Sequence, residues 1–124
     1  MNQILAIAAG GAVGSVLRFW MSTWVHSFAG RTFPYGTLTV NVLGCLAMGF
    51  LFVLFVDRLS DNAVLRAGIL IGVLGGFTTF SSFAVQSFNL LRDGEIFLAS
   101  ANIVISNMVG LFLVWVGYAV SRAL

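Results

Sequence analysis

The chain has 124 residues, of which 60% are hydrophobic and only 8% are charged, and its mean hydropathy is +1.04. Soluble domains carry about 25% charged residues, so the composition excludes a soluble protein and predicts a single membrane domain over residues 1–124. The formal net charge is +2, and the arginines are scattered singly among apolar segments, which excludes the basic patch that nucleic-acid binding requires.

Four apolar segments are long enough to cross a membrane as helices, which takes roughly 20 residues each. We expect the first span over roughly residues 4–28 and the second over residues 34–56, beginning at Pro34, the only proline. The third is expected over residues 63–91 and the fourth over residues 95–118. The predicted fold is an all-α membrane protein with four transmembrane helices per subunit.

The third span contains the segment GGFTTFSSF, from Gly75 to Phe83, near its centre. Lipid tolerates irregular backbone only where protein or a water-filled path covers it, so we expect a helix broken at mid-membrane. One half-helix would end near Gly75, leaving carbonyl groups that suit a hard cation. The other would begin near Thr78, with free N–H groups and a positive dipole end that favour an anion.

The arginines are divided almost evenly between the two sides that four spans define. One side holds Arg58, Arg66 and Arg122, and the other holds Arg31 and Arg92, with Arg18 inside the first span near it. Since the asymmetry of basic residues in short loops sets orientation, this balance predicts insertion both ways round. Two oppositely oriented copies would then form an antiparallel, dual-topology homodimer.

Titratable groups are almost absent from the predicted spans. All four acids fall in or beside loops, the only histidine, His26, is near the end of the first span, and Cys45 is the only cysteine. A proton-coupled exporter needs a titratable group within the membrane, and the predicted spans offer none. No Ser/His/Asp set or metal cluster can be assembled either, so we expect that the chain is not an enzyme.

Neutral hydrogen-bonding side chains occur in the spans instead. Asn41 stands out, because a buried amide cannot be satisfied by its own helix alone, and Thr37 shares its helix face. The fourth span contains Asn102, Ser106 and Asn107. Such donors replace part of an ion's hydration shell and still release the ion.

Two phenylalanines of the third span, Phe80 and Phe83, lie three residues apart on one helical face. Ser81 and Ser82 lie between them. An aromatic ring has a positive edge, so the two rings could make weak, dry contacts with an anion. Packing against lipid or another helix is the alternative explanation for both rings.

Three segments of the chain resemble the small bacterial fluoride channels of the Fluc or CrcB family. Gly75 to Phe83 closely resembles the third-helix signature of the family, Gly36 to Asn41 looks like its second motif, and Gly10 to Phe19 is similar to its first helix. The resemblance implies a multi-pass protein of the bacterial plasma (inner) membrane that forms an antiparallel homodimer. It also implies passive, selective export of fluoride from the cytoplasm through two pores.

The resemblance further implies roles for single residues. The expected ion pathway consists of the rings of Phe80 and Phe83, the amide of Asn41, the hydroxyls of Ser81, Ser82 and Thr37, and Arg18 near a pore mouth. The carbonyl groups of Gly75 and Thr78 would hold a structural sodium ion at the dimer axis. The chain departs from the family pattern at Ala84, where serine is common, and at Gln86, where glutamate is common.

Two other classes of membrane protein are alternatives to a channel. A small multidrug-type exporter has similar length and can insert both ways, but it would need a glutamate in the first span, and residues 4–28 contain no acid. The second alternative is a non-conducting subunit that packs against other membrane proteins, but this function does not explain the expected interruption of the third span. Ion flux through the purified protein separates these possibilities.

Overall fold

The computed structural model describes residues 1–59 and 61–124, and every regular element within these residues is helical. Within these residues, four helical spans are long and apolar enough to cross a membrane. They are Asn2–Ala29, Tyr35–Arg58, Ala63–Arg92 and Ile96–Ala123. The expected all-α fold with four membrane-length helices is therefore confirmed, although the fourth span continues well past residue 118.

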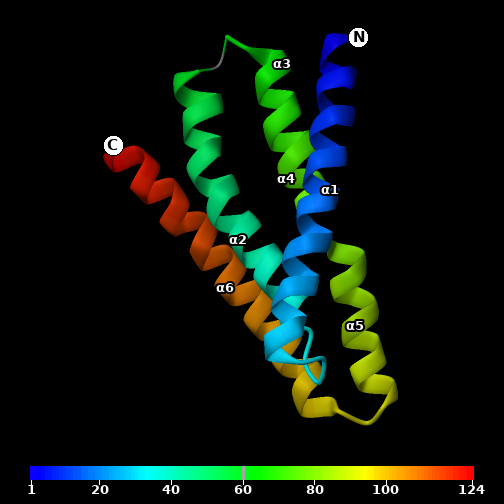
Figure 1. The fold of residues 1–124 in the computed structure, drawn as a ribbon. Helices are drawn as coiled ribbons and strands as arrows, with labels where there is room; N and C mark the ends of the chain where they lie inside the picture. Colours follow the sequence, from blue (N-terminus) through cyan, green and yellow to red (C-terminus); the bar gives the residue numbers. More distant parts are fainter. Residues whose placement is uncertain (60) are drawn as a thin grey trace.

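The second span is divided into two helical elements and the third into four, whereas the first and fourth are single helices. In chain order the elements are α1 (Asn2–Ala29), α2 (Tyr35–Phe52), η1 (Val53–Arg58), α3 (Ala63–Arg66), η2 (Ala67–Val73), α4 (Leu74–Phe77), α5 (Phe80–Arg92) and α6 (Ile96–Ala123). The spans alternate in direction, so the N-terminus and the start of α3 lie at one end of the molecule, and the α5–α6 turn lies at the other (Figure 1).

Small residues allow two pairs of helices to approach closely. A side chain at Gly14 of α1 would overlap the backbone carbonyl of Val73 in η2, and one at Gly117 of α6 would overlap the carbonyl of Leu46 in α2. The hydrophobic effect does not drive helices together in lipid, so tight backbone contact of this kind is a main source of helix association there. The two contacts fix α1 against the third span and α6 against α2.

Two π-helical segments, η1 and η2, were not predicted from the sequence. They face each other through a small buried cluster in which Phe55 of η1 meets Leu70 of η2 and Leu74 of α4. A π-helical turn closes its hydrogen bonds over five residues instead of four and is often found near functional sites. Here η2 leads directly into the short α4, which ends where the third span is interrupted.

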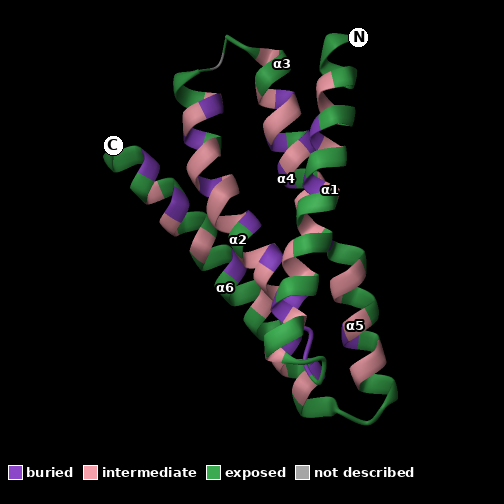
Figure 2. Cartoon of the chain, viewed as in Figure 1, coloured by how far each residue is buried: buried purple, intermediate pink, exposed green. Residues whose placement is uncertain are grey.

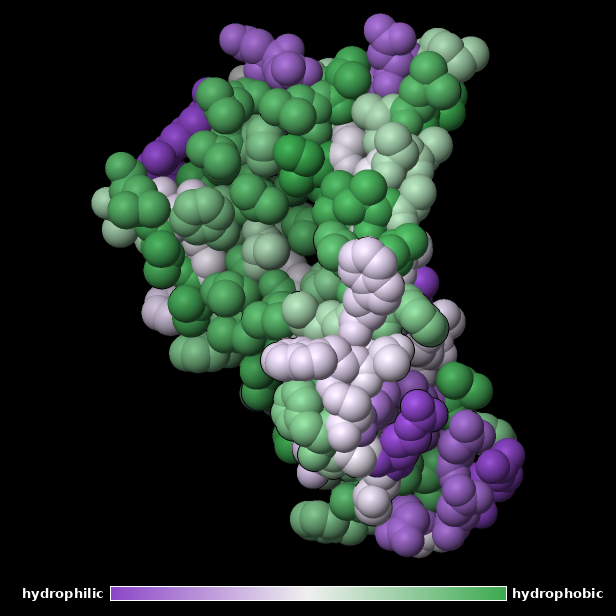
Figure 3. Space-filling model, in the orientation of Figure 1, coloured by the Kyte–Doolittle hydropathy of each residue, from purple (hydrophilic) through white to green (hydrophobic). Residues whose placement is uncertain are grey.

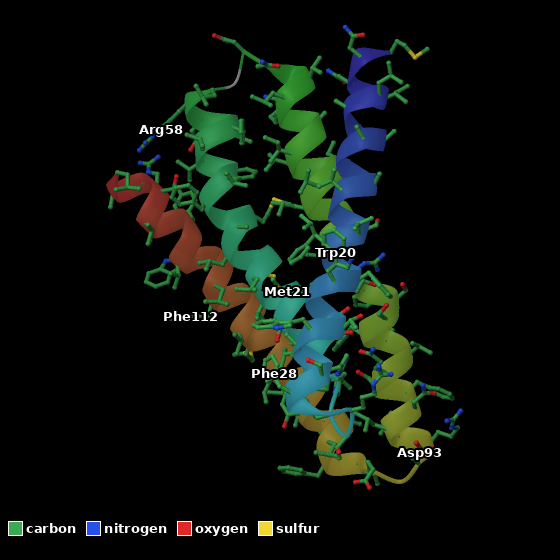
Figure 4. All side chains as sticks on the ribbon, viewed as in Figure 1. Trp20, Met21, Phe28, Arg58, Asp93 and Phe112 are labelled. Atoms are coloured by element: carbon green, nitrogen blue, oxygen red, sulfur yellow. The ribbon has the colours of Figure 1, made fainter. Side chains whose placement is uncertain are left out.

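Most of the apolar surface faces outward. In the most apolar window of each span, only 11% to 28% of the residues are buried inside the chain, and Figure 2 shows buried positions as small patches between intermediate and exposed ones. Hydrophobic side chains cover most of the upper and left middle parts of the face drawn in Figure 3, and hydrophilic ones gather at its top edge and lower right. This distribution suits a bilayer, with Arg58 and Asp93 near opposite ends and Phe112 pointing outward between them (Figure 4).

Candidate functional site

The third span leaves helical conformation at two threonines. Thr78 and Thr79 have extended backbones, with φ/ψ of −88°/157° and −151°/112°. The N–H and the hydroxyl of Thr78 both donate to the carbonyl of Leu74, each at 3.0 Å, which closes α4. The hydroxyl of Thr79 accepts the N–H of Ser82 at 3.3 Å and caps α5. In the structure α4 ends at Phe77 and α5 begins at Phe80.

The side chain of Asn41 pairs with the backbone of Thr79 through two hydrogen bonds. Its Nδ2 donates to the Thr79 carbonyl at 3.0 Å, and its Oδ1 accepts the Thr79 N–H at 2.8 Å. The amide of α2 therefore satisfies the peptide groups that are freed between α4 and α5, as a buried backbone requires. An asparagine amide has two N–H groups, and Thr79 uses one of them.

Thr79 lines a cavity of about 410 Å³. It brings together Arg18, Thr37 and Ser82 from three different spans. Its described lining contains hydroxyls and two arginines, Arg18 and Arg31, but no carboxylate, so the charged groups that line it are cationic. A neighbouring cavity of about 440 Å³ shares His26, Arg31 and Gln86 with it and adds the acids of the α5–α6 turn.

Thr79 also lines a second, mainly apolar cavity of about 280 Å³. Asn41, Thr78 and Phe80 contribute to its lining together with residues of α2 and α6. The Phe80 side chain is 79% exposed, so its ring projects from the surface of the subunit. The Phe83 ring is half-buried, with its centroid 5.6 Å from that of Phe80 and the two planes inclined by 47°.

The remaining expected residues lie close to the two threonines but line neither of these cavities. Ser81 is exposed, and its hydroxyl lies 3.5 Å from that of Thr79. Gly75 is also exposed, and a side chain added there would meet nothing within 4 Å. The structure therefore groups Arg18 with Thr37 and Ser82 in one cavity, and Asn41 with Phe80 in another, and Thr79 lines both.

Three features of the site were missed by sequence reasoning. Thr79 is buried and holds both the Asn41 pairing and the α5 cap. Asn102 of α6 donates from Nδ2 to the Ser87 hydroxyl of α5 at 2.9 Å, and both residues are buried. Gln86 has a buried Oε1 without a hydrogen-bond partner among the described residues, and it lines the polar cavity. Spacing within one span cannot reveal pairs that join different spans.

The family model described as "CrcB-like protein, Camphor Resistance (CrcB)" matches residues 5–118. The chain belongs to this family. Its membership confirms the resemblance read from the three sequence motifs. Together with the four membrane-length helices, it identifies a CrcB-family, multi-pass protein of the bacterial inner membrane.

Several relatives within the CrcB family carry the name "Fluoride-specific ion channel FluC". The chain is 43% identical to the one from Geotalea uraniireducens (strain Rf4) and 43% identical to the one from Aquifex aeolicus (strain VF5), in each case over 124 residues that cover 100% of both chains. It is 45% identical to that of Geobacter sulfurreducens over the same full length. These relatives are named ion channels, so the expectation that the chain is not an enzyme is confirmed, and the multidrug-type exporter gains no support.

Proposed function

We propose that the chain forms a passive fluoride channel that exports fluoride from the cytoplasm. The observation that carries the proposal is the cavity lined by Arg18 and Arg31 that reaches Thr79, where the third span leaves helical conformation. Such a cavity attracts anions, and the residues described around it include no carboxylate that would oppose them. The names of the full-length relatives support fluoride as the anion.

Fluoride enters this channel through the polar cavity. The guanidinium group of Arg18 raises its local concentration, and the hydroxyls of Thr37 and Ser82 replace part of its water shell. Neutral hydroxyls are suited to this exchange, because they bind the ion without trapping it. The N-terminus of α5 adds a positive dipole end at the same place.

Beyond this point the ion passes Asn41 and the two aromatic rings. The amide hydrogen of Asn41 that Thr79 does not use donates to fluoride. The positive ring edges of Phe80 and Phe83 and the exposed Ser81 then complete a narrow path. Passive conduction needs no titratable group, so HF that enters and dissociates inside would leave as the anion, driven by the membrane potential.

A second, antiparallel subunit completes the path. Phe80 projects from the subunit with 79% of its side chain exposed, and Gly75 is also on the outside. An ion path along exposed rings needs walls, and the even distribution of arginines favours a partner inserted in the opposite orientation. The two-fold relation gives two such paths per dimer.

The carbonyl groups of Gly75 and Thr78 fit a structural sodium ion at this interface. In a continuous helix they would accept the N–H groups of Thr79 and Ser82. Those N–H groups instead donate to the Asn41 amide and the Thr79 hydroxyl. Two carbonyl oxygens are thereby left for a hard cation, which oxygen ligands suit. When bound, the ion would supply a fixed positive charge that joins the two subunits.

Ion efflux from liposomes that contain the purified protein tests this function. Fluoride loss is measured with a fluoride electrode and chloride loss with a chloride electrode, without a proton gradient. We expect fast fluoride loss and negligible chloride loss. Absence of fluoride flux from well-folded dimers would refute the channel, and flux that needs a proton gradient would favour an exporter.

A further inference from the structure

α5 carries both rings of the proposed path, yet it is the most loosely attached long helix of the subunit. It packs against α6 and, more sparsely, against α2. Figure 1 shows α5 and α6 diverging from the turn that joins them, so their contact is limited to the region near that turn. The rotation of α5 about its own axis therefore depends on a few specific contacts.

The first of these contacts is the pairing of Asn41 with Thr79, directly before α5. The second is the hydrogen bond from Asn102 Nδ2 to the hydroxyl of Ser87, at 2.9 Å. Asn102 is 2% exposed and Ser87 is 5% exposed, so this bond is formed away from solvent and lipid. A buried amide that lost this partner would leave an unsatisfied donor, which opposes any rotation that breaks the bond.

The second contact lies on the face of α5 that carries the rings. Ser87 follows Phe83 by four residues and Phe80 by seven, so the three side chains share one face at 3.6 residues per turn. The hydroxyl of Ser87 also donates to the backbone carbonyl of Phe83 at 2.8 Å. The chain of donors from Asn102 through Ser87 thus ends on the peptide of a ring-bearing residue.

We infer that Asn102 is a positioning residue for fluoride conduction: through Ser87 it fixes the rotation of α5 and thereby holds the Phe83 ring in the ion path. The inference rests on the proposed function for its effect on fluoride, but its effect on the ring is independent of it. Asn102 itself need not touch the ion. Ser106 supports it from the same helix by donating to its Oδ1 at 3.3 Å.

The test compares Asn102→Leu and Ser87→Ala with Asn107→Leu. Asn107 is a matched control, because it is an exposed asparagine of the same helix and donates only to the Ile103 carbonyl of its own turn, at 2.7 Å. Fluoride efflux is measured from liposomes for each variant. In parallel, 4-fluorophenylalanine is placed at position 83, and the ¹⁹F NMR spectrum reports the ring environment without reference to flux.

We expect efflux to fall about tenfold in Asn102→Leu and in Ser87→Ala. Loss of one buried hydrogen bond changes the ratio of the two orientations of α5 by about that factor. The double variant should be no slower than either single one, since both remove the same bond. The ¹⁹F resonance should shift or split in both variants and stay single and unshifted in Asn107→Leu.

An unchanged ¹⁹F spectrum in both variants would overturn the inference, whatever the flux. A changed spectrum with wild-type efflux would also overturn it, because the ring would then move without affecting conduction. If the unmodified protein conducts no fluoride, the proposed function fails. A changed spectrum in that case would still support the positional role of Asn102.

Discussion

At the residue scale, the pairing of Asn41 with Thr79 gives the amide a structural role in addition to the donor role that we propose for it. Both bonds replace hydrogen bonds that a continuous helix would make, so the amide stabilises extended backbone that would otherwise be costly in lipid. The sequence could indicate that Asn41 needs a partner outside its own helix. It could not identify Thr79, because the partner lies 38 residues away and only packing brings the two together.

A negative charge at position 41 should block fluoride. We expect Asn41→Asp to reduce efflux at least about tenfold, because a carboxylate repels the anion and cannot donate the hydrogen bond. Liposome efflux measures the change, and Thr39→Val serves as the control, because the Thr39 hydroxyl donates to its own helix at Tyr35. Wild-type efflux in Asn41→Asp would show that the amide has only a structural role.

The two rings should be needed for conduction but not for folding. Phe80→Ile and Phe83→Ile keep apolar volume and remove the positive ring edges, so fluoride efflux should fall while dimers remain intact by size-exclusion chromatography. Phe88→Ile, at an exposed position of the same helix, is the matched control. If both Phe80→Ile and Phe83→Ile release fluoride as fast as the unmodified protein and Phe88→Ile, the aromatic path is refuted.

At the element scale, the interruption between α4 and α5 depends on side chains that end one helix and start the next. The glycines and hydroxyls of residues 75–83 draw attention to this segment in the sequence. The position of its ends could not be predicted, since Thr78 bonds back to Leu74 and extends α4, and Thr79 supplies the cap of α5. The π-helical segments also escaped prediction, because their apolar pattern resembles that of an ordinary helix.

Loss of the Thr79 hydroxyl should destabilise α5. Thr79→Val keeps the shape of the side chain but removes the acceptor for the Ser82 N–H, which should cost about 1 kcal/mol, as for other helix caps. Thermal unfolding in detergent measures the effect, and Thr79→Ser, which keeps the hydroxyl, should remain close to the unmodified protein. A similar midpoint for the valine and serine variants would argue against the cap.

At the scale of the whole molecule, the chain forms little interior of its own. Composition alone predicted the number of spans, because about 20 apolar residues are needed for each. It could not predict the diverging arrangement of α5 and α6 (Figure 1), which leaves the Phe80 ring on the outside. The site was therefore only partly predictable: residue types pointed to an anion path, while the grouping around Thr79 required the fold.

Orientation in the membrane should respond to single arginines. Replacing Arg31 and Arg92 with alanine leaves basic loop residues on one side only. These are Arg58, Arg66 and Arg122, while Arg18 stays inside the first span. We expect this variant to insert in one orientation, as read by reporters fused to its C-terminus, and to lose efflux. Co-expression with a variant that lacks Arg58 and Arg122 should restore efflux through mixed antiparallel dimers. Mixed orientation in the first variant would contradict dual topology.

The π-helical segments have a consequence for the comparison of homologous sequences. Because a π-helical turn accommodates one residue more than an α-helical turn, removing one residue from Val53–Arg58 would return that segment to α-helical spacing without changing the phase of the helix on either side. Sequence alignments should therefore tolerate a one-residue gap within residues 53–58 or 67–73. The same gap within Phe80–Arg92, which is regular α-helix, would turn Ser87 away from Asn102.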